Sequence, residues 1–148
     1  MVHSATLTIR TATPPDLAAL VAIDSFAHSH VERVEFLRRS LALGQCVVAA
    51  INTDVVGHAI LNYTFFEFGF VQLVVVAPAH RRQGVGFRLL EALERRCSST
   101  KLFASANSSD VAARRLFIRA GFIESGHVEN LDPNDPEVVY FKPLHRAP

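Results

Sequence analysis

The segment that most constrains the fold of this chain runs from residue 73 to residue 86. It opens on Leu73-Val74-Val75-Val76, an apolar and mostly β-branched run that predicts a buried strand. Ala77-Pro78-Ala79-His80-Arg81-Arg82-Gln83-Gly84-Val85-Gly86 follows, a short turn whose glycines let the backbone approach a ligand closely. An apolar-periodic helix comes next, and the N–H groups of its first turn have no partner within the helix. The segment therefore predicts a binding site for an anion at the positive end of a helix.

Within this segment, residues 81–86 follow the pattern [Arg/Gln]-x-x-Gly-x-[Gly/Ala], and we call them the cradle. A dinucleotide fingerprint is excluded because Leu89 stands where its third glycine belongs. A P-loop is excluded because no Gly-Lys-[Ser/Thr] follows. A diphosphate suits the remaining pattern, and the alternative is an ordinary turn whose arginines are merely solvated.

Length and composition narrow the class of protein. The 148 residues suit one domain, 1–148, and a hydrophobic share of 49% with 20% charged residues is typical of a globular fold. A net charge of +1 gives no broad attraction to nucleic acid or to membrane surfaces. The apolar runs are shorter than the roughly 20 residues of a membrane span, and the first residues do not read as a signal peptide. Cys46 and Cys97 lie in apolar stretches and are predicted to be buried thiols of a cytoplasmic protein.

Hydrophobic periodicity predicts the order of the elements along the whole chain. Strands are expected at about 7–10, 46–51, 55–63, 70–77, 102–106, 122–128 and 138–141. Helices are expected from Thr13, over about 31–43, after the cradle, and from Asp110. The third helix shows an apolar stripe of Val85, Leu89, Leu93 and Cys97, and the fourth a stripe of Val111, Leu116, Phe117 and Ala120. An aromatic turn covers 64–69. This order predicts a mixed sheet with helices packed on its faces.

Two segments together resemble the GNAT acetyltransferase superfamily. The first is the run from strand through cradle to helix. The second runs from Asn107 to Phe122 and is similar to the family's Asn-x-x-Ala-x-x-Leu-Tyr-x-x-x-Gly-Phe segment, with Asp110 in place of the Asn and Phe117 in place of the Tyr. The resemblance covers essentially the whole chain. It implies an α/β (α+β) fold with a mixed, mostly antiparallel central sheet of about seven strands and about four helices on its faces.

The resemblance also implies a cytoplasmic N-acetyltransferase that uses acetyl-CoA as co-substrate, without a metal, and an amine of a small molecule or peptide as acceptor. By resemblance, the pantetheine arm pairs with the backbone of 74–76, where that strand splays away from 102–106. The residues expected to bind acetyl-CoA are Val74, Val75, Val76, Arg81, Arg82, Gln83, Gly84, Val85, Gly86, Asn107 and Phe117. A backbone N–H near Val75 can polarise the thioester oxygen.

The catalytic groups are less defined. Family members often supply the proton for the leaving thiolate from the Tyr whose place Phe117 holds, and a phenyl ring has no acid function. Ser109 and Tyr140 are the candidate substitutes, and Glu67 is a candidate general base through a chain of waters. His28 and His30 have no third ligand at metal-binding spacing, so no metal site is expected.

The partners follow from two further segments. The acidic loop 129–137 either attracts a cationic amine or serves turn geometry alone. The aromatic turn at 65–68 offers an exposed apolar patch for a homodimer. Two rival functions stay open: a non-catalytic acyl-CoA-binding module, and a protein-interaction domain that keeps the fold without the ligand.

Overall fold

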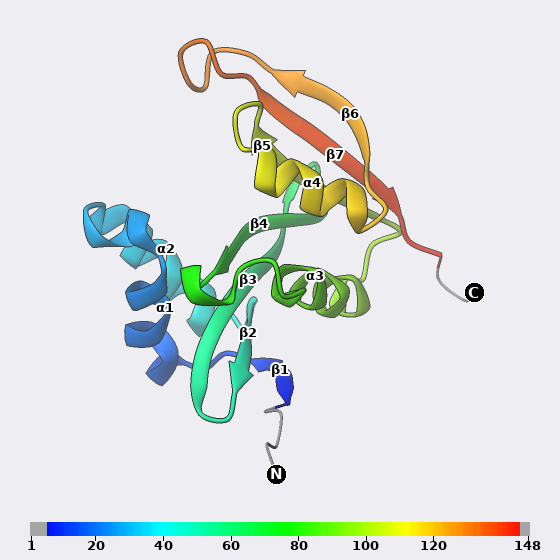
Figure 1. Cartoon of the computed structure of the whole chain (residues 1–148). Helices are drawn as coiled ribbons and strands as arrows, with labels where there is room; N and C mark the ends of the chain where they lie inside the picture. Colours follow the sequence, from blue (N-terminus) through cyan, green and yellow to red (C-terminus); the bar gives the residue numbers. More distant parts are fainter. Residues whose placement is uncertain (1–5, 146–148) are drawn as a thin grey trace. The chain divides into compact units, whose positions relative to one another are not determined.

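A computed structural model describes residues 6–145 of the chain (Figure 1). Its strands are β1 (Leu7–Thr11), β2 (Cys46–Ile51), β3 (Asp54–Phe65), β4 (Phe68–Val76), β5 (Lys101–Asn107), β6 (Ile123–Val128) and β7 (Glu137–Pro143). Its α-helices are α1 (Leu17–Ile23), α2 (Val31–Ala42), α3 (Val85–Arg96) and α4 (Val111–Arg119). Three short 3-10 helices are η1 (Pro14–Asp16), η2 (Ser25–His28) and η3 (Pro78–His80).

The strands form one seven-stranded sheet in the order β1-β2-β3-β4-β5-β7-β6. The pairs β1–β2, β2–β3, β5–β7 and β6–β7 are antiparallel, and β4–β5 is parallel. The predicted fold class, a mixed and mostly antiparallel sheet with helices on its faces, is therefore confirmed.

Two compact units make up the chain. Unit 1 comprises the residues up to Ile60 together with Leu73–Leu93, and unit 2 comprises Leu61–Gln72 together with the residues from Glu94 onward. The strands β3 and β4 each contribute residues to both units. The expectation of a single domain over 1–148 stays a prediction.

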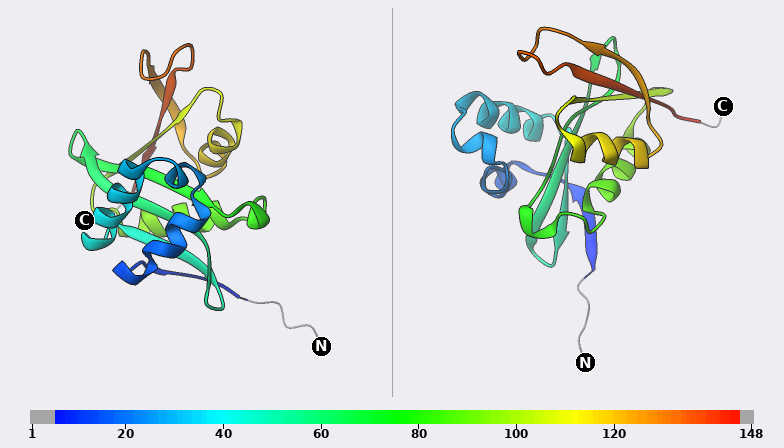
Figure 2. Two further views of the ribbon diagram at one scale, coloured as in Figure 1. Left: turned by 90° about the vertical axis from the view of Figure 1, so that its left-hand side faces the viewer. Right: turned by 45° about the horizontal axis from the view of Figure 1, so that its top comes forward.

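In unit 1, α1 and α2 lie side by side over one face of the strands (Figures 1 and 2). Their apolar positions, among them Leu20, Leu37 and Leu41, pack with strand residues such as Val48 and Ile60 into one buried cluster. The opposite face carries α3. There a Cβ on Gly57 would lie 3.0 Å from Val85 Cγ1 and 3.1 Å from the Val75 carbonyl oxygen. The missing side chain of Gly57 thus lets β3, β4 and the start of α3 pack closely.

The predicted start of the first helix is correct in position, but η1 precedes α1 there. The Asp16 carboxylate accepts a hydrogen bond of 2.8 Å from the Thr13 backbone N–H. Arg10 donates two more at 2.9 Å each. These bonds, those from Arg10 above all, lower the pKa of Asp16 to about 2. The two prolines and this carboxylate explain why the chain turns into a helix here.

In unit 2, α4 covers one face of β5 and β7. Leu102, Ala104 and Tyr140 point toward it and are buried. Phe117 lies 5.4 Å from the Tyr140 ring, measured between centroids. One prediction is wrong: Val111, placed in the buried stripe of α4, is 52% exposed because it begins the helix at its outer side.

The aromatic turn is tighter than the predicted 64–69. The hairpin closes on two residues, Phe66 and Glu67, whose φ angles are 52° and 69°. Both cysteines are buried, as expected, and neither forms a disulfide. Burial raises the pKa of the Cys46 thiol to about 12. Among the described residues, no helix combines the length and apolarity needed to cross a membrane.

Candidate active site

The cradle lies in unit 1, between the end of β4 and the start of α3. Arg82 and Gly84 both have left-handed backbone conformations, with φ of 61° and 82°. The first intrahelical bond runs from Arg88 N–H to the Gly84 carbonyl, at 3.0 Å. The N–H groups of Val85 and Gly86, which precede it, have no carbonyl within the helix to bind. The turn therefore presents backbone donors at the positive end of α3.

Side chains of the cradle support this geometry. Arg81 Nε donates to the Val76 carbonyl oxygen at 3.2 Å, which ties the guanidinium to the end of β4. Gln83 Nε2 donates to the Ala79 carbonyl oxygen at 3.4 Å. Arg81, Arg82 and Gln83 are exposed. The structure thus brings the predicted residues 81–86 into one cationic turn, and their binding of a coenzyme diphosphate stays a prediction.

The three valines expected to pair with pantetheine end β4, and their side chains are half-buried. The Ala77 N–H donates to the Val56 carbonyl oxygen of β3 at 2.8 Å, so the residue after β4 is still hydrogen-bonded to β3. The parallel pairing of β4 with β5 covers Gly69–Val71 opposite Leu102–Ala104, all of it in unit 2. The pairing of the pantetheine arm with Val74, Val75 and Val76 stays a prediction.

Asn107 and Phe117, the other predicted coenzyme contacts, lie in unit 2. Asn107 ends β5, and its side-chain amide donates to Asp132 at 2.7 Å. Phe117 is 4% exposed and packs between the rings of Phe122 and Tyr140. Phe117 therefore acts in this unit as a packing residue on the inner side of α4.

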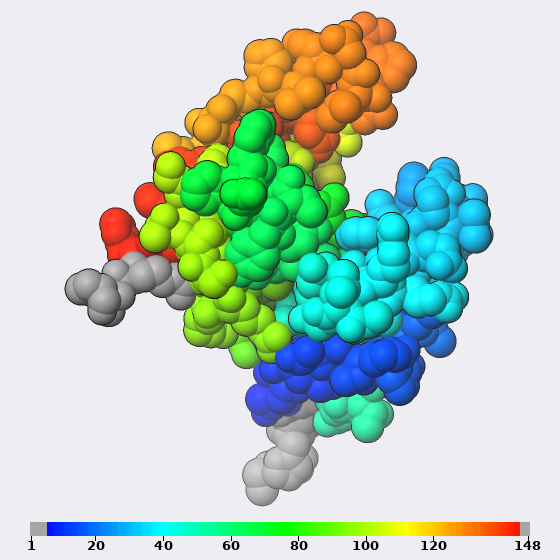
Figure 3. Space-filling view, turned by 180° about the vertical axis from the view of Figure 1, so that it is seen from behind, coloured from blue at the N-terminus to red at the C-terminus, as the bar shows by residue number. Residues whose placement is uncertain are grey.

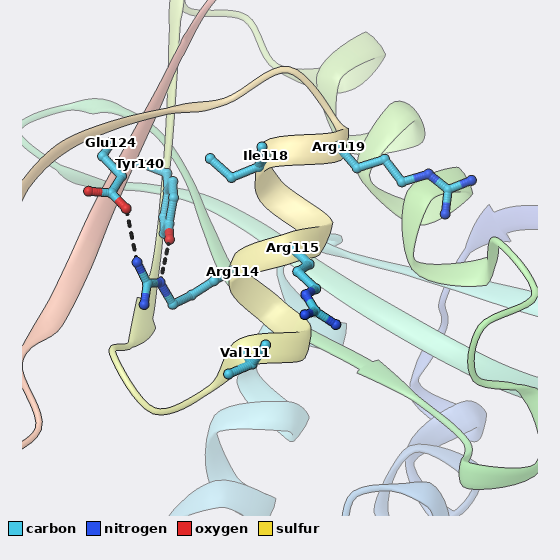
Figure 4. Close-up of a pocket in the computed structure, with 7 residues that line it drawn as sticks. All are labelled: Val111, Arg114, Arg115, Ile118, Arg119, Glu124 and Tyr140. Carbon is cyan, nitrogen blue, oxygen red and sulfur yellow. Dashed lines mark hydrogen bonds and ion pairs between the residues drawn. The ribbon is translucent and has the colours of Figure 1, made fainter.

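The candidate proton donors are both engaged in hydrogen bonds. The Ser109 hydroxyl donates to Asp135 Oδ2 at 2.6 Å, and the Ser109 N–H binds the other carboxylate oxygen at 3.0 Å. The Tyr140 hydroxyl accepts from Arg114 Nε at 2.9 Å (Figure 4). Its own proton remains available for donation. Arg114 also binds Glu124 at 3.0 Å, so this guanidinium fixes the Tyr140 ring against α4.

Around that guanidinium, α4 and the neighbouring strands line a hollow of about 380 Å³. Its lining residues are Val111, Arg114, Arg115, Ile118, Arg119, Glu124 and Tyr140 (Figure 4). Glu67, the candidate base, is exposed in the β3–β4 turn. Glu67 lies just before the first residue of β4, whereas the cradle lies beyond the last residue of β4, so the two are at opposite ends of that strand. The catalytic assignments of Glu67, Ser109 and Tyr140 stay predictions.

Glu137, which the sequence places at the end of the acidic loop, is the first residue of β7. Glu137 is half-buried, and its pKa is raised, first by loss of solvation and then by the charges of Asp132, Asp135 and Asp110. A hydrogen bond from Ser105 partly opposes the rise. Glu137 lies opposite Asn107 in the β5–β7 register. The sequence did not indicate its desolvation, because Glu137 is half-buried by strands that are distant in sequence.

No metal-binding group of three or more His, Cys, Asp or Glu side chains occurs within residues 6–145. The acidic loop nevertheless gathers carboxylates at the end of β5. Asp132 and Asp135 are held there by Asn107 and Ser109, at the beginning of α4. The loop is thus fastened to the unit by charge-assisted hydrogen bonds rather than freely solvated.

The fold is a mixed α/β sheet with helices on its faces, and the cradle is a turn of backbone donors and arginines at the start of α3. Comparison with known proteins identifies the family: residues 15–122 match the acetyltransferase (GNAT) family. The chain therefore belongs to the GNAT acetyltransferases. The predicted resemblance is confirmed.

One solved structure supports this assignment, and a second shows the same fold. A GNAT-family acetyltransferase from Bacillus cereus ATCC 10987 is 30% identical, with a TM-score of 0.89 over 95% of this chain and 99% of that one. A putative acetyltransferase from Salmonella typhimurium, solved with its cofactor acetyl-CoA, is 24% identical with a TM-score of 0.76, over 95% of both chains.

A curated relative, the mycothiol acetyltransferase of Amycolatopsis mediterranei (strain U-32), is 39% identical over 79 residues. These residues are 53% of this chain and 26% of the relative. The match thus spans about a quarter of that protein.

Proposed function

We propose that the protein transfers the acetyl group of acetyl-CoA to an amine, by direct attack of the amine on the thioester. The observation that carries this proposal is the cradle at the start of α3, in a chain of the GNAT family. Its backbone donors and the Arg81 guanidinium suit the diphosphate of the coenzyme. No metal is needed, because a thioester is activated enough for attack when its oxygen is hydrogen-bonded.

The acceptor is an amine of a small molecule or peptide, and we propose that it is cationic in solution. A free alkylamine has a pKa of about 10 and is mostly protonated at neutral pH. The carboxylates fastened at the end of β5, chiefly Asp132, Asp135 and Glu137, give that end of unit 2 a negative potential. Such a potential raises the local concentration of cations.

Before it can attack, the ammonium must lose a proton, and we propose Glu137 as the acceptor of that proton. Its raised pKa makes it a stronger base than an ordinary carboxylate. Its position opposite Asn107 supports the role, because the family resemblance assigns Asn107 to the acyl-CoA site. Glu137→Gln should lower kcat and remove the acidic limb of the pH profile, while the acetyl-CoA KM stays the same. Glu129→Gln, on the same loop, is the matched control.

A non-catalytic acyl-CoA-binding module is the second candidate. It is favoured by Phe117, a buried ring without a hydroxyl in the place of the usual Tyr. One assay separates the two: a panel of amines with acetyl-CoA, in which release of free CoA is followed with a thiol reagent. Turnover with any amine supports the enzyme, and tight CoA binding with no turnover across the panel supports the module.

We also propose that the protein works in the cytoplasm. Cys46 and Cys97 support this because neither forms a disulfide, as expected for a reducing compartment. Fractionation of cells with an antibody to the chain tests it.

A further inference from the structure

The β3–β4 turn carries an aromatic residue in a conformation that disfavours it. Phe66 and Glu67 are both left-handed, with φ of 52° and 69°. A two-residue hairpin of this kind favours Asn-Gly, because a bulky residue at positive φ is strained. Phe66 is nevertheless 80% exposed, and its ring meets Phe65 edge-on at 5.0 Å. An observed strain of this kind points to a role beyond the fold.

Beside this turn, five phenylalanines lie together on one face of the unit 2 strands. We call them the aromatic face: Phe65, Phe68, Phe70, Phe103 and Phe141. The Phe103 ring lies 4.8 Å from Phe65, 6.0 Å from Phe68 and 5.4 Å from Phe141. All five are half-buried. The helix α4 packs on the opposite face, so it does not cover them.

The turn and the aromatic face form one continuous apolar surface. Atoms of the β3–β4 turn lie at the surface in the space-filling view (green in Figure 3). Ile123, which pairs with Phe141 and shares its side of the sheet, extends the surface and is 59% exposed. Contiguous exposed apolar area of this kind marks an interaction site.

The charges at its edge are of opposite sign. Lys101 is exposed, and its ammonium lies 5.0 Å from the centroid of the Phe68 ring. Glu67 is exposed beside Phe66. In a two-fold symmetric pair, each contact occurs twice, so Glu67 of each copy can meet Lys101 of the other. A surface with edge charges of a single sign would repel its own copy, and the net charge of +1 opposes association little.

We propose that this surface, formed by the aromatic face and the β3–β4 turn, binds a second copy of the chain in a two-fold symmetric homodimer. Phe66 of each copy packs on the aromatic face of the other, and Glu67 pairs with Lys101 at the edge. Rings supply the buried centre, and the ion pairs fix the orientation. The proposal goes beyond acetyl transfer and does not depend on it.

Sedimentation equilibrium of the full chain over a range of concentrations tests the proposal. The unaltered protein should dimerise. Phe66→Asn should raise the dimer dissociation constant at least about tenfold, the effect of losing a central aromatic anchor. At concentrations where both proteins are monomeric, it should keep or raise the melting temperature, because Asn tolerates the left-handed conformation. Leu43→Asn, at an exposed apolar position after α2, is the matched control and should leave the dissociation constant unchanged.

Exchanging the two charges tests whether Glu67 of one copy pairs with Lys101 of the other. Glu67→Lys and Lys101→Glu should each weaken the dimer, and the double variant should restore it, because the opposite charges again face one another. A protein that is monomeric at every concentration overturns the proposal. So does a dimer that all of these substitutions leave intact. Binding of the monomer to phospholipid vesicles, lost in Phe66→Asn, would assign the surface to a membrane and equally refute the homodimer.

Discussion

Acidification should destabilise unit 1 through His58, a histidine of β3 that is fully buried. Neither of its ring nitrogens makes a well-formed hydrogen bond to the described residues. Loss of solvation lowers the pKa of His58 to about 4, from the usual 6.5. The Asp24 carboxylate and the Leu20 backbone act against this shift, and the Arg33 guanidinium adds to it. These two form a salt bridge of 2.8 Å, so their charges largely offset each other at the imidazole.

The sign and size of the change in the free energy of unfolding follow from proton linkage. Between pH 6.5 and about 4 the unfolded chain binds a proton at this histidine and the folded chain does not. The free energy of unfolding therefore rises with pH through this window and reaches its full value above 6.5. Each tenfold difference in proton affinity is worth about 1.4 kcal/mol, so the loss on acidification approaches about 3 kcal/mol. That is a large part of the stability of a domain this size.

Urea denaturation followed by circular dichroism, repeated from pH 7.5 to 4, measures this loss. His58→Leu removes the titration and leaves no unpaired nitrogen, so its free energy of unfolding should match that of the parent at neutral pH and fall less on acidification. The difference between the two free energies of unfolding gives the contribution of His58, because carboxylates that titrate in the same pH range contribute equally to both proteins. His127→Gln, at an exposed histidine, is the control. Parallel curves for parent and His58→Leu would refute the reasoning, as would an imidazole NMR signal of His58 that titrates near 6.5.

Three further predictions concern the coenzyme and the acceptor. Gly84→Val, which forces a β-branched residue to a φ of 82°, and Gly86→Glu, which sets a negative charge before the diphosphate, should each weaken CoA binding in calorimetry by more than about tenfold. Phe117→Leu should lower the free energy of unfolding by about 1 kcal/mol with CoA affinity unchanged; loss of turnover in a stable variant would contradict this. The double variant Asp132→Asn/Asp135→Asn should raise the KM for the amine and leave the KM for acetyl-CoA unchanged. It should also flatten the salt dependence of the amine KM. Kinetics like those of the parent would show that the loop serves only as a turn.

The parts of the fold that local sequence determines were predictable. The stripe of α3 is buried as expected at Val85, Leu89 and Leu93. The capped start before α1 and the glycine after α2 also lie where the sequence indicates. The family segment around α4 was recognisable because its spacing reflects one helix packed on one strand. In each case the signal and its cause lie within about a dozen residues of chain.

Other features depend on residues that meet only in the folded chain. The β3–β4 turn was predicted too wide because Phe66-Glu67 lacks the Asn or Gly that usually marks a two-residue hairpin. The neutral state of His58 depends on its loss of solvation in the folded chain, and the charged pair near it, Asp24 and Arg33, is 34 and 25 positions earlier in the sequence. The strand pattern around His58 indicates burial, but it cannot indicate what surrounds the ring.

The proposed coenzyme site is determined by local sequence, whereas the proposed acceptor site depends on residues that are distant in sequence. The coenzyme side rests on backbone donors of one turn, which a motif describes, and Gly57 fixes that turn by letting α3 approach β4 closely. The acceptor side rests on the solvation of Glu137 and on loop carboxylates held by Asn107 and Ser109, 25 or more residues away. Substitutions in that loop can therefore change which amine the protein accepts without disturbing the cradle. Because the cradle and the loop lie in different segments, variants of the loop should alter acceptor kinetics and leave the backbone donors of the cradle as they are.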